Sequence, residues 1–167
     1  SLLDSILKGY PIGTFILWQT SERINDIKNV GNLDIPDTPE GTKVQYVLDG
    51  QQRITSLFAA YLGAKIQKPG EKKITDYSNI FVNLDGDIDI NDEQLITAEP
   101  IGEKYLSLHD VLNFSYSKAR ELSDKFSESE LETINSYSTA FKTYEFSTVV
   151  LRKEDIDSAI EVFTRIN

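Results

Sequence analysis

A polar cluster, Asp49-Gly50-Gln51-Gln52-Arg53, stands between an apolar run and an apolar helical period in the stretch VLDGQQRITSL. A glycine turn at the start of a helix presents backbone N–H groups to an anion, and Gly50 lets a ligand approach the backbone closely. Arg53 adds a guanidinium whose fork geometry suits phosphate. Asp49 could hold Mg²⁺ or position a water beside that phosphate. These residue types in this order predict a phosphate-binding site.

The same stretch also has a purely structural interpretation. Asp49 could be the N-cap of the helix, and Gln52, three residues later, could complete a capping box. Such a cap is worth about 1 kcal/mol. The cap does not explain why Gln51 joins the cluster. It does not explain Arg53 either, since a cation in the first turn meets the positive end of the helix dipole. The stretch is not a Walker A loop, because the chain contains no G-x-x-x-x-G-K-[ST] pattern. Both interpretations stay open at this point.

Two further stretches have simpler explanations. GYPIG, residues 9–13, ends a helix and begins a strand, which its Gly and Pro residues explain by themselves. A functional role requires this stretch to lie beside the DGQQR cluster, which is possible, but not implied, if that strand pairs in one sheet with the strand before Gly50. The acidic stretch DGDIDIND, residues 85–92, fails the EF-hand pattern, because Ile90 and Ile96 occupy the positions that require Gly and Glu. An acidic hairpin is favoured there.

His109 and Arg165 are single candidates with ordinary structural roles. His109 is the one histidine of a chain without cysteine, which excludes a His-based triad and a two-His metal site within this chain. A surface or helix-packing role is therefore favoured. Arg165 stands near the end of an amphipathic helix, where a cation interacts favourably with the helix dipole. From the residues alone, Arg165 is expected on the solvated face of that helix.

Apolar spacing predicts the helices that must position these residues. Gly63 follows the clearest period as a C′ residue with left-handed backbone, and Ser107 is expected as an N-cap. The periods predict helices over residues 2–7, 54–62, 106–112, 116–126, 128–142 and from about residue 153 to the end.

Short apolar runs predict strands between these helices. A hairpin turn at Asp85-Gly86 is expected to lead into a second strand near Ile88 and Ile90. Residues 19–43 and 67–79 are polar and rich in turn formers, so they are expected to be loops. The strands are predicted at residues 14–18, 43–48, 80–84 and 144–151. This order of elements predicts a mixed α+β domain.

The composition limits the function further. The chain has 167 residues, which suits a single domain, and its net charge of −10 opposes a broad nucleic-acid or membrane surface but not a local positive site. The absence of Cys excludes disulfides, thiolate zinc sites and a cysteine nucleophile. No apolar run approaches the roughly 20 residues that a membrane helix needs. The chain lacks Met and stops inside an apolar period, so both ends are expected to be truncated.

The stretch YVLDGQQRITSL closely resembles the DGQQR signature of the GmrSD-type N-terminal domain. This family occurs in bacterial and archaeal modification-dependent restriction and anti-phage proteins. Upstream, SILKGYPIGTFILW is similar to the family's helix, Gly-Tyr-Pro-Ile-Gly turn and strand, and downstream EVFTRIN is similar to its phenylalanine-to-asparagine segment. The three blocks match in order over nearly the whole chain. The resemblance implies a small mixed sheet with flanking helices, of the ParB/sulfiredoxin-like kind.

The resemblance also implies a nucleoside-triphosphate-binding domain that hydrolyses the nucleotide. The nucleotide would be GTP, ATP or CTP, and Asp49 would hold Mg²⁺. Carried over by residue, the phosphate and hydrolysis site comprises Asp49, Gly50, Gln51, Gln52 and Arg53. The resemblance also implies that Pro11, Ile12 and Gly13 line the nucleotide pocket. The last helix would contribute Arg165 and Asn167.

In the family this domain usually precedes an HNH-type nuclease domain, and together they restrict modified foreign DNA. This chain has no HNH signature, so residues 1–167 are expected to form a single domain whose parent protein supplies the nuclease and the DNA contacts. The family's upstream Gln-Arg and aromatic segment is not present in this chain, and sulfiredoxin-type reduction is excluded without Cys. A cytoplasmic, prokaryotic location is expected. Two alternatives remain, a non-hydrolysing nucleotide- or DNA-responsive module of the ParB-like type, and a structural fragment in which DGQQR is only a cap.

Overall fold

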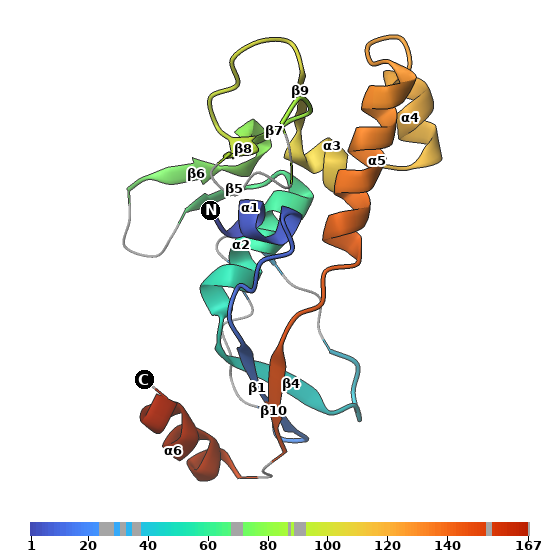
Figure 1. The fold of residues 1–167 in the computed structure, drawn as a ribbon. Coiled ribbons are helices and arrows are strands. Elements are labelled where there is room, and N and C mark those ends of the chain that lie inside the picture. Colours follow the sequence, from blue (N-terminus) through green and yellow to red (C-terminus); the bar gives the residue numbers. More distant parts are fainter. Residues whose placement is uncertain are drawn as a thin grey trace. The chain divides into compact units, whose positions relative to one another are not determined.

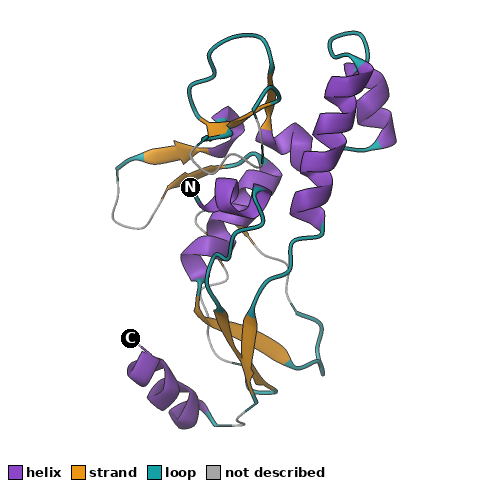
Figure 2. Cartoon of the chain, viewed as in Figure 1, coloured by secondary structure: helices purple, strands orange, loops and turns teal. Residues whose placement is uncertain are grey.

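Helices and small mixed sheets alternate along the chain, which confirms the predicted α+β class (Figures 1 and 2). The structure is a computed structural model that describes residues 1–23, 29–30, 33–34, 38–67, 72–86, 88, 93–152 and 155–166. The chain groups into two compact units, one formed by residues 1–12 with 56–145 and the other by residues 13–55 with 146–167. Each unit therefore combines two distant segments of the sequence.

The first unit contains most of the helices and two small antiparallel sheets. The helices are α1 (Leu2–Leu7), the part of α2 (Gln51–Leu62) from Ser56 onward, α3 (Leu108–Leu112), α4 (Tyr116–Leu122) and α5 (Glu128–Lys142). The strands are β5 (Lys65–Gln67), β6 (Ile74–Asp76), β7 (Phe81–Asn83), β8 (Ile96–Thr97) and β9 (Tyr105–Ser107), with the 3-10 turn η1 (Tyr77–Asn79) before β7. β5 pairs with β6, and β7 lies between β8 and β9.

Local sequence signals explain where several of these helices begin and end. Ser127 and Glu130 form a capping box at the start of α5. Ser107 caps α3, and Gly63 has a φ of +60° after α2, so both predictions are confirmed. His109 contacts the carbonyl oxygen of Tyr61 through Nδ1 at 2.8 Å, which gives it the favoured helix-packing role.

The second unit is built around a three-stranded sheet. Its central strand is β1 (Phe15–Thr20), which pairs in parallel with β10 (Thr148–Leu151) and antiparallel with β4 (Val44–Asp49). The helix α6 (Ile156–Ile166) follows β10 (Figure 1). A separate short ladder joins β2 (Asn29–Val30) to β3 (Leu33–Asp34). Because β1 and β4 are neighbours, the turn before β1 and the turn after β4 lie at the same end of the sheet.

Some predicted strands and loops differ from the structure. The predicted hairpin across Asp85-Gly86 is wrong for the described residues, since Ile88 lies in a turn and Ile90 lies outside them. Asn83 instead donates its N–H to the carbonyl of Leu95, so β7 finds its partners further along the chain.

Other differences concern the bounds of elements. The expected loop over residues 67–79 contains β6 and the end of β5, and the loop over residues 19–43 contains the end of β1 as well as β2 and β3. The predicted strand over residues 144–151 is limited to β10, and the helix predicted over residues 116–126 ends at Leu122. Strands of two or three residues carry too few alternating side chains to give a periodic signal. Among the described residues, no helix combines the length and apolar character that crossing a membrane requires.

Candidate functional site

The junction between β4 and α2 is a one-residue turn at Gly50. β4 ends at Asp49 and α2 begins at Gln51, while Gly50 has a φ of +96°, a backbone conformation that favours glycine. A Cβ atom at Gly50 would lie 2.4 Å from Cδ1 of the buried Phe15 ring. Glycine is therefore required at this position both by the backbone and by packing. The first N–H groups of α2 follow directly, and a helix offers them no internal acceptor.

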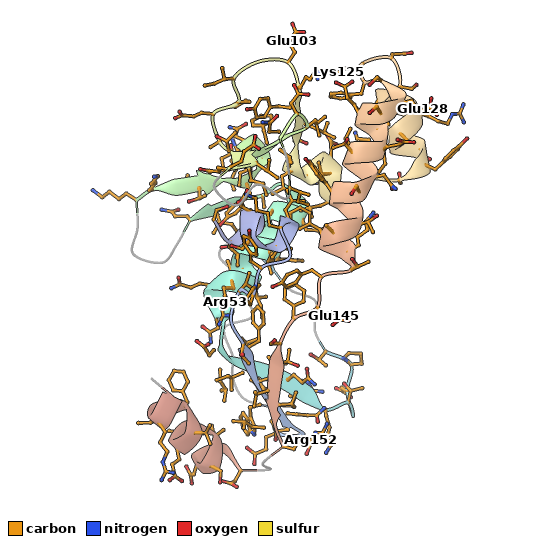
Figure 3. All side chains as sticks on the ribbon, in the orientation of Figure 1. Arg53, Glu103, Lys125, Glu128, Glu145 and Arg152 are labelled. Carbon is orange, nitrogen blue, oxygen red and sulfur yellow. The ribbon has the colours of Figure 1, made fainter. Side chains whose placement is uncertain are left out.

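Arg53 lies in the first turn of α2 (Figure 3). Its side chain contacts Asp49, Thr14 and Phe15. Its Nη2 atom donates to Oδ2 of Asp49 at 2.9 Å and to the carbonyl oxygen of Thr14 at 3.0 Å. Its Cζ atom lies 4.7 Å from the centroid of the Phe15 ring, a cation–π contact. The side chain is 24% exposed. The guanidinium is thus fixed in one orientation while part of it remains accessible.

The structure brings Gly13 to the same place. β1 and β4 pair in one sheet, so Gly13, just before β1, lies beside the DGQQR cluster at the end of β4. A functional role of residues 9–13 required this neighbourhood. Gly13 has a φ of +88°, and a Cβ atom there would lie 2.6 Å from Nη1 of Arg53. The guanidinium can therefore approach the backbone only because residue 13 is glycine. Pro11 and Ile12 belong to the other compact unit, and their predicted role stays a prediction.

The predicted capping box is wrong. Gly50 occupies the position before the helix and accepts the N–H of Ile54 through its carbonyl, while the carboxylate of Asp49 accepts from Arg53. Gln51 donates through Nε2 to the carbonyl of Val47 at 2.9 Å. The helix begins later than a cap at Asp49 requires, so Asp49 belongs to the strand and its carboxylate is directed to the guanidinium. Arg53, whose position the predicted cap did not explain, is the ion-pair partner of Asp49.

A β-bulge precedes the turn. Along β1 the consecutive residues Ile16 and Leu17 face Asp49 and Val47 of β4, so Leu48 is an extra residue on β4. Bulges re-aim side chains and are frequent beside functional sites. Here the bulge separates the end of β4 from the regular pleat, at the point where the chain turns toward α2.

All five residues of the predicted motif line one hollow, which is called the DGQQR hollow below. Its volume is about 380 Å³. The described residues that line it are Leu48, Asp49, Gly50, Gln51, Gln52, Arg53 and Phe163. The five consecutive residues of the motif thus form one contiguous surface, which contains a cation, a carboxylate, two amides and a helix N-terminus. Such a surface can bind an anion.

Two aromatic residues of this region were not singled out from the sequence. Phe15 opens the apolar run TFILW and supports Arg53 and Gly50, and its ring packs edge-on against Phe146 at 5.6 Å between centroids. Phe163 belongs to the apolar period of the last helix and reaches the DGQQR hollow from α6. The apolar patterns of both segments were visible, but which of their aromatic side chains meet the motif depends on the tertiary fold.

The predicted residues at the end of α6 lie differently. Arg165 is 77% exposed, donates to Oε1 of Glu161 at 2.6 Å and is not among the residues that line the DGQQR hollow. Asn167 lies outside the described residues. The part predicted for both of them in nucleotide binding stays a prediction.

The donor set fits a metal ion that arrives with its ligand better than a protein-held one. Asp49 is the one carboxylate among the described residues that line the DGQQR hollow. The described part of the chain contains no group of three or more His, Cys, Asp or Glu residues that could hold a metal ion. Mg²⁺ commonly binds through one or two carboxylates together with phosphate oxygens. Asp49 matches that arrangement, while the described residues of the hollow do not form a cage of protein ligands.

Comparison with known protein families matches residues 1–167 to the family described as GmrSD restriction endonuclease, N-terminal domain. The match covers the whole chain and therefore both compact units. A search of curated proteins finds no match.

Proposed function

Because the chain belongs to the family of GmrSD restriction endonuclease N-terminal domains, and hence to a restriction system, we propose that it binds a nucleoside triphosphate at the DGQQR hollow and hydrolyses it. The observation that carries this proposal is the fixed guanidinium of Arg53. It stands at the N-terminus of α2, in a hollow that every residue of the motif lines. Polyphosphate is the anion whose charge and size suit this combination.

Preorganisation supports phosphate binding. Asp49, Thr14 and Phe15 restrain Arg53 before any ligand arrives, so little side-chain entropy is lost on binding. The net charge of −10 does not oppose a single nucleotide, because one ligand with its metal ion needs only a local positive site. In this proposal Arg53 and the first N–H groups of α2 hold the phosphates.

Hydrolysis would depend mainly on positioning and charge stabilisation. Asp49 is the candidate to hold Mg²⁺ against the phosphates or to orient the attacking water, and Mg²⁺ would neutralise the charge that develops on them. Arg53 would stabilise the same charge from its fixed position. Gln51 and Gln52 supply amides that can orient water or phosphate oxygens.

One observation favours a second function, nucleotide binding without hydrolysis. The carboxylate of Asp49 is already engaged by Arg53 at 2.9 Å, and the described lining of the hollow offers no other acidic residue. In this case nucleotide occupancy would itself be the signal, as in a ParB-like module. In both versions the chain regulates an HNH-type nuclease domain of the parent protein, and DNA is contacted through that parent.

Ligand titration of the full-length parent protein tests the proposal. GTP, ATP and CTP are titrated with and without Mg²⁺, while binding and phosphate release are both recorded. The key variant is Arg53→Ala, and the matched control is Arg152→Ala. Arg152 follows β10 at the end where Leu151 pairs with Trp18, so it lies at the opposite end of the sheet from Arg53 (Figure 3).

The proposal predicts binding of at least one triphosphate, a loss of about tenfold or more in affinity with Arg53→Ala, and wild-type affinity with Arg152→Ala. Binding with phosphate release supports the hydrolase, while binding without release supports the regulatory module. Absence of binding to all three nucleotides by the full-length protein would reject both. Unchanged affinity in Arg53→Ala would show that the role assigned to Arg53 is wrong.

A further inference from the structure

A second hollow adjoins the DGQQR hollow, and its walls are apolar. Its volume is about 260 Å³. It lies among residues of β1, β4, α2 and α6, and is called the apolar hollow below. The residues that line it are Trp18, Tyr46, Val47, Leu48, Gln51, Ile156, Ala159, Ile160 and Phe163. All of them belong to the second compact unit.

The two hollows are continuous in their lining. Leu48, Gln51 and Phe163 contribute to both of them. The bulge residue Leu48 and the first helical residue Gln51 therefore stand where a charged surface passes into an apolar one. Taken together, the two hollows have the size of an ordinary small-molecule site, for which about 300–1,000 Å³ is typical. A ligand with an anionic end and an apolar end would match this sequence of surfaces.

The fold covers the side chains around the apolar hollow unequally. Trp18 and Ala159 are buried, at 1% and 2% exposure, and Trp18 lies 5.6 Å from Tyr46 between ring centroids. On α6, by contrast, Ile160 is 53% exposed and Phe163 is 42% exposed. Burying exposed apolar surface of this kind is favourable. Trp18 and Ala159 thus form a buried inner wall of the hollow. Ile160 and Phe163 form an exposed outer wall that a flat ligand could cover.

We propose that the apolar hollow holds the base of the nucleotide whose phosphates occupy the DGQQR hollow. The inference rests on the proposed function and adds a binding surface to it. A nucleobase is flat and heteroaromatic, so it gains affinity from contact with aromatic and aliphatic side chains. Gln51 is the polar side chain at the junction, and its amide can meet the polar edge of the base or the ribose. α6 then acts as one wall of the nucleotide site through Ile160 and Phe163.

The test compares ligands with and without a base. Full-length protein is titrated, without Mg²⁺, with inorganic tripolyphosphate and with ATP, CTP and GTP. Ile160→Asn replaces an apolar wall residue by a smaller, neutral polar one, and Ile160 lines the apolar hollow but not the DGQQR hollow. Val149→Asn is the matched control, because Val149 is 48% exposed on β10 and lines neither hollow. Arg53→Ala is included as the phosphate-site variant.

At least one nucleoside triphosphate is expected to bind about tenfold more tightly than tripolyphosphate, since contact with a base contributes on this scale. Ile160→Asn should weaken that nucleotide about fivefold and leave tripolyphosphate unchanged, which also shows that the variant is folded. Val149→Asn should change neither affinity. Equal affinity of wild-type protein for tripolyphosphate and all three nucleotides would overturn the base site without any variant.

The outcomes separate this inference from the proposed function. Binding of tripolyphosphate that depends on Arg53, without any preference for a base, rejects the apolar hollow alone. Nucleotide binding that Ile160→Asn leaves unchanged rejects it as well. If neither tripolyphosphate nor any nucleotide binds, and a repeat with Mg²⁺ also shows no binding, the proposed function itself is wrong and so is the base site.

Discussion

The guanidinium of Arg53 donates a 2.9 Å hydrogen bond to the carboxylate of Asp49, four residues earlier and on the other side of the Gly50 turn. The pair spans the end of a strand and the first turn of a helix. The two side chains are 24% and 43% exposed, so the ion pair contributes only about 0–1 kcal/mol to stability. Its main effect is positional, since it offsets the unfavourable placement of a cation near a helix N-terminus and fixes the guanidinium.

Asp49→Asn separates the positional effect of this pair from catalysis. The substitution retains the shape of the side chain but removes a negative charge that faces the proposed phosphates. Without Mg²⁺, triphosphate affinity should rise about two- to fivefold, because a repulsive charge is lost while the amide oxygen of the new side chain can still accept the hydrogen bond from Arg53. With Mg²⁺, phosphate release should fall at least tenfold if Asp49 serves the metal or the water. Parallel binding and phosphate-release assays check both effects. Wild-type rates of release in Asp49→Asn would show that Asp49 has no catalytic role.

Alanine substitutions at three glycines test whether the site depends on close backbone packing. Gly13, Gly41 and Gly50 all have positive φ, so alanine should cost about 1–2 kcal/mol from backbone strain at each. A Cβ atom at Gly41 meets nothing within 4 Å, whereas one at Gly13 or Gly50 would collide with Arg53 or Phe15. Gly50→Ala should therefore destabilise the protein more than the control Gly41→Ala in urea unfolding.

Binding should distinguish the same variants in another way. Gly13→Ala displaces Nη1 of Arg53, which would lie 2.6 Å from the new Cβ atom, so triphosphate affinity should fall even where the protein remains folded. Gly41→Ala should retain the wild-type affinity in isothermal titration. Equal affinities of Gly13→Ala and Gly41→Ala would show that the close approach of Arg53 to Gly13 has no part in the proposed phosphate binding.

The parts of this fold that the sequence predicts best are those with long local periods. α5 and the body of α2 each repeat apolar residues over more than two turns, so their helical signal exceeds the noise of single positions. The DGQQR cluster was also found locally, because its five residues are consecutive. By contrast, β5 and β6 have three residues each, and their pairing is decided by tertiary contacts.

Local sequence patterns do not predict the detailed geometry of the site. Arg53 and the carbonyl of Thr14 are 39 residues apart, and only the pairing of β1 with β4 brings them together. The bulge at Leu48 leaves no sequence signal, since Val47, Leu48 and Asp49 continue an ordinary strand pattern. The start of α2 depends on one residue of register, and this shift turned the expected cap at Asp49 into an ion pair.

Asp4 should be a main determinant of stability in the first unit. Its carboxylate accepts the N–H groups of Leu95 at 2.9 Å and Ile96 at 3.3 Å, and it lies 3.8 Å from the ammonium group of Lys8. The Lys8 side chain is 1% exposed and also donates to the carbonyl oxygen of Glu93, so loss of the Asp4 carboxylate removes a neutralising negative charge from beside a buried ammonium group. Asp4→Ala should lower the free energy of unfolding by about 3 kcal/mol, measured by urea denaturation.

A second Asp→Ala variant controls for the loss of an ion pair alone. Asp85 lies 3.0 Å from the ammonium group of Lys104, and both side chains are more than half exposed. Asp85→Ala should therefore change stability by no more than about 1 kcal/mol. Similar losses in Asp4→Ala and Asp85→Ala would show that the buried environment of Lys8 does not determine the effect.

Acid should destabilise the first unit through carboxylates with lowered pKa values. Burial raises the pKa of Asp110, but hydrogen bonds from Lys118 and Ser107 outweigh it and hold the pKa below its usual 3.8. The N–H of Ser127 lowers the pKa of Glu130 below its usual 4.5. Each group therefore stabilises the fold above its unfolded pKa, and this contribution is lost as the pH falls through the lower folded value.

The free energy of unfolding should consequently decrease from about pH 5 downward. Asp110→Asn and Glu130→Gln should be less stable than the wild type at pH 7, and the difference should shrink as the pH approaches 3, because the wild-type carboxylates then become protonated. Urea midpoints measured at pH 7, 5, 4 and 3 check this convergence, with each variant at pH 7 as its own reference. A constant difference at every pH would assign the loss to altered packing instead of to the charge of Asp110 or Glu130.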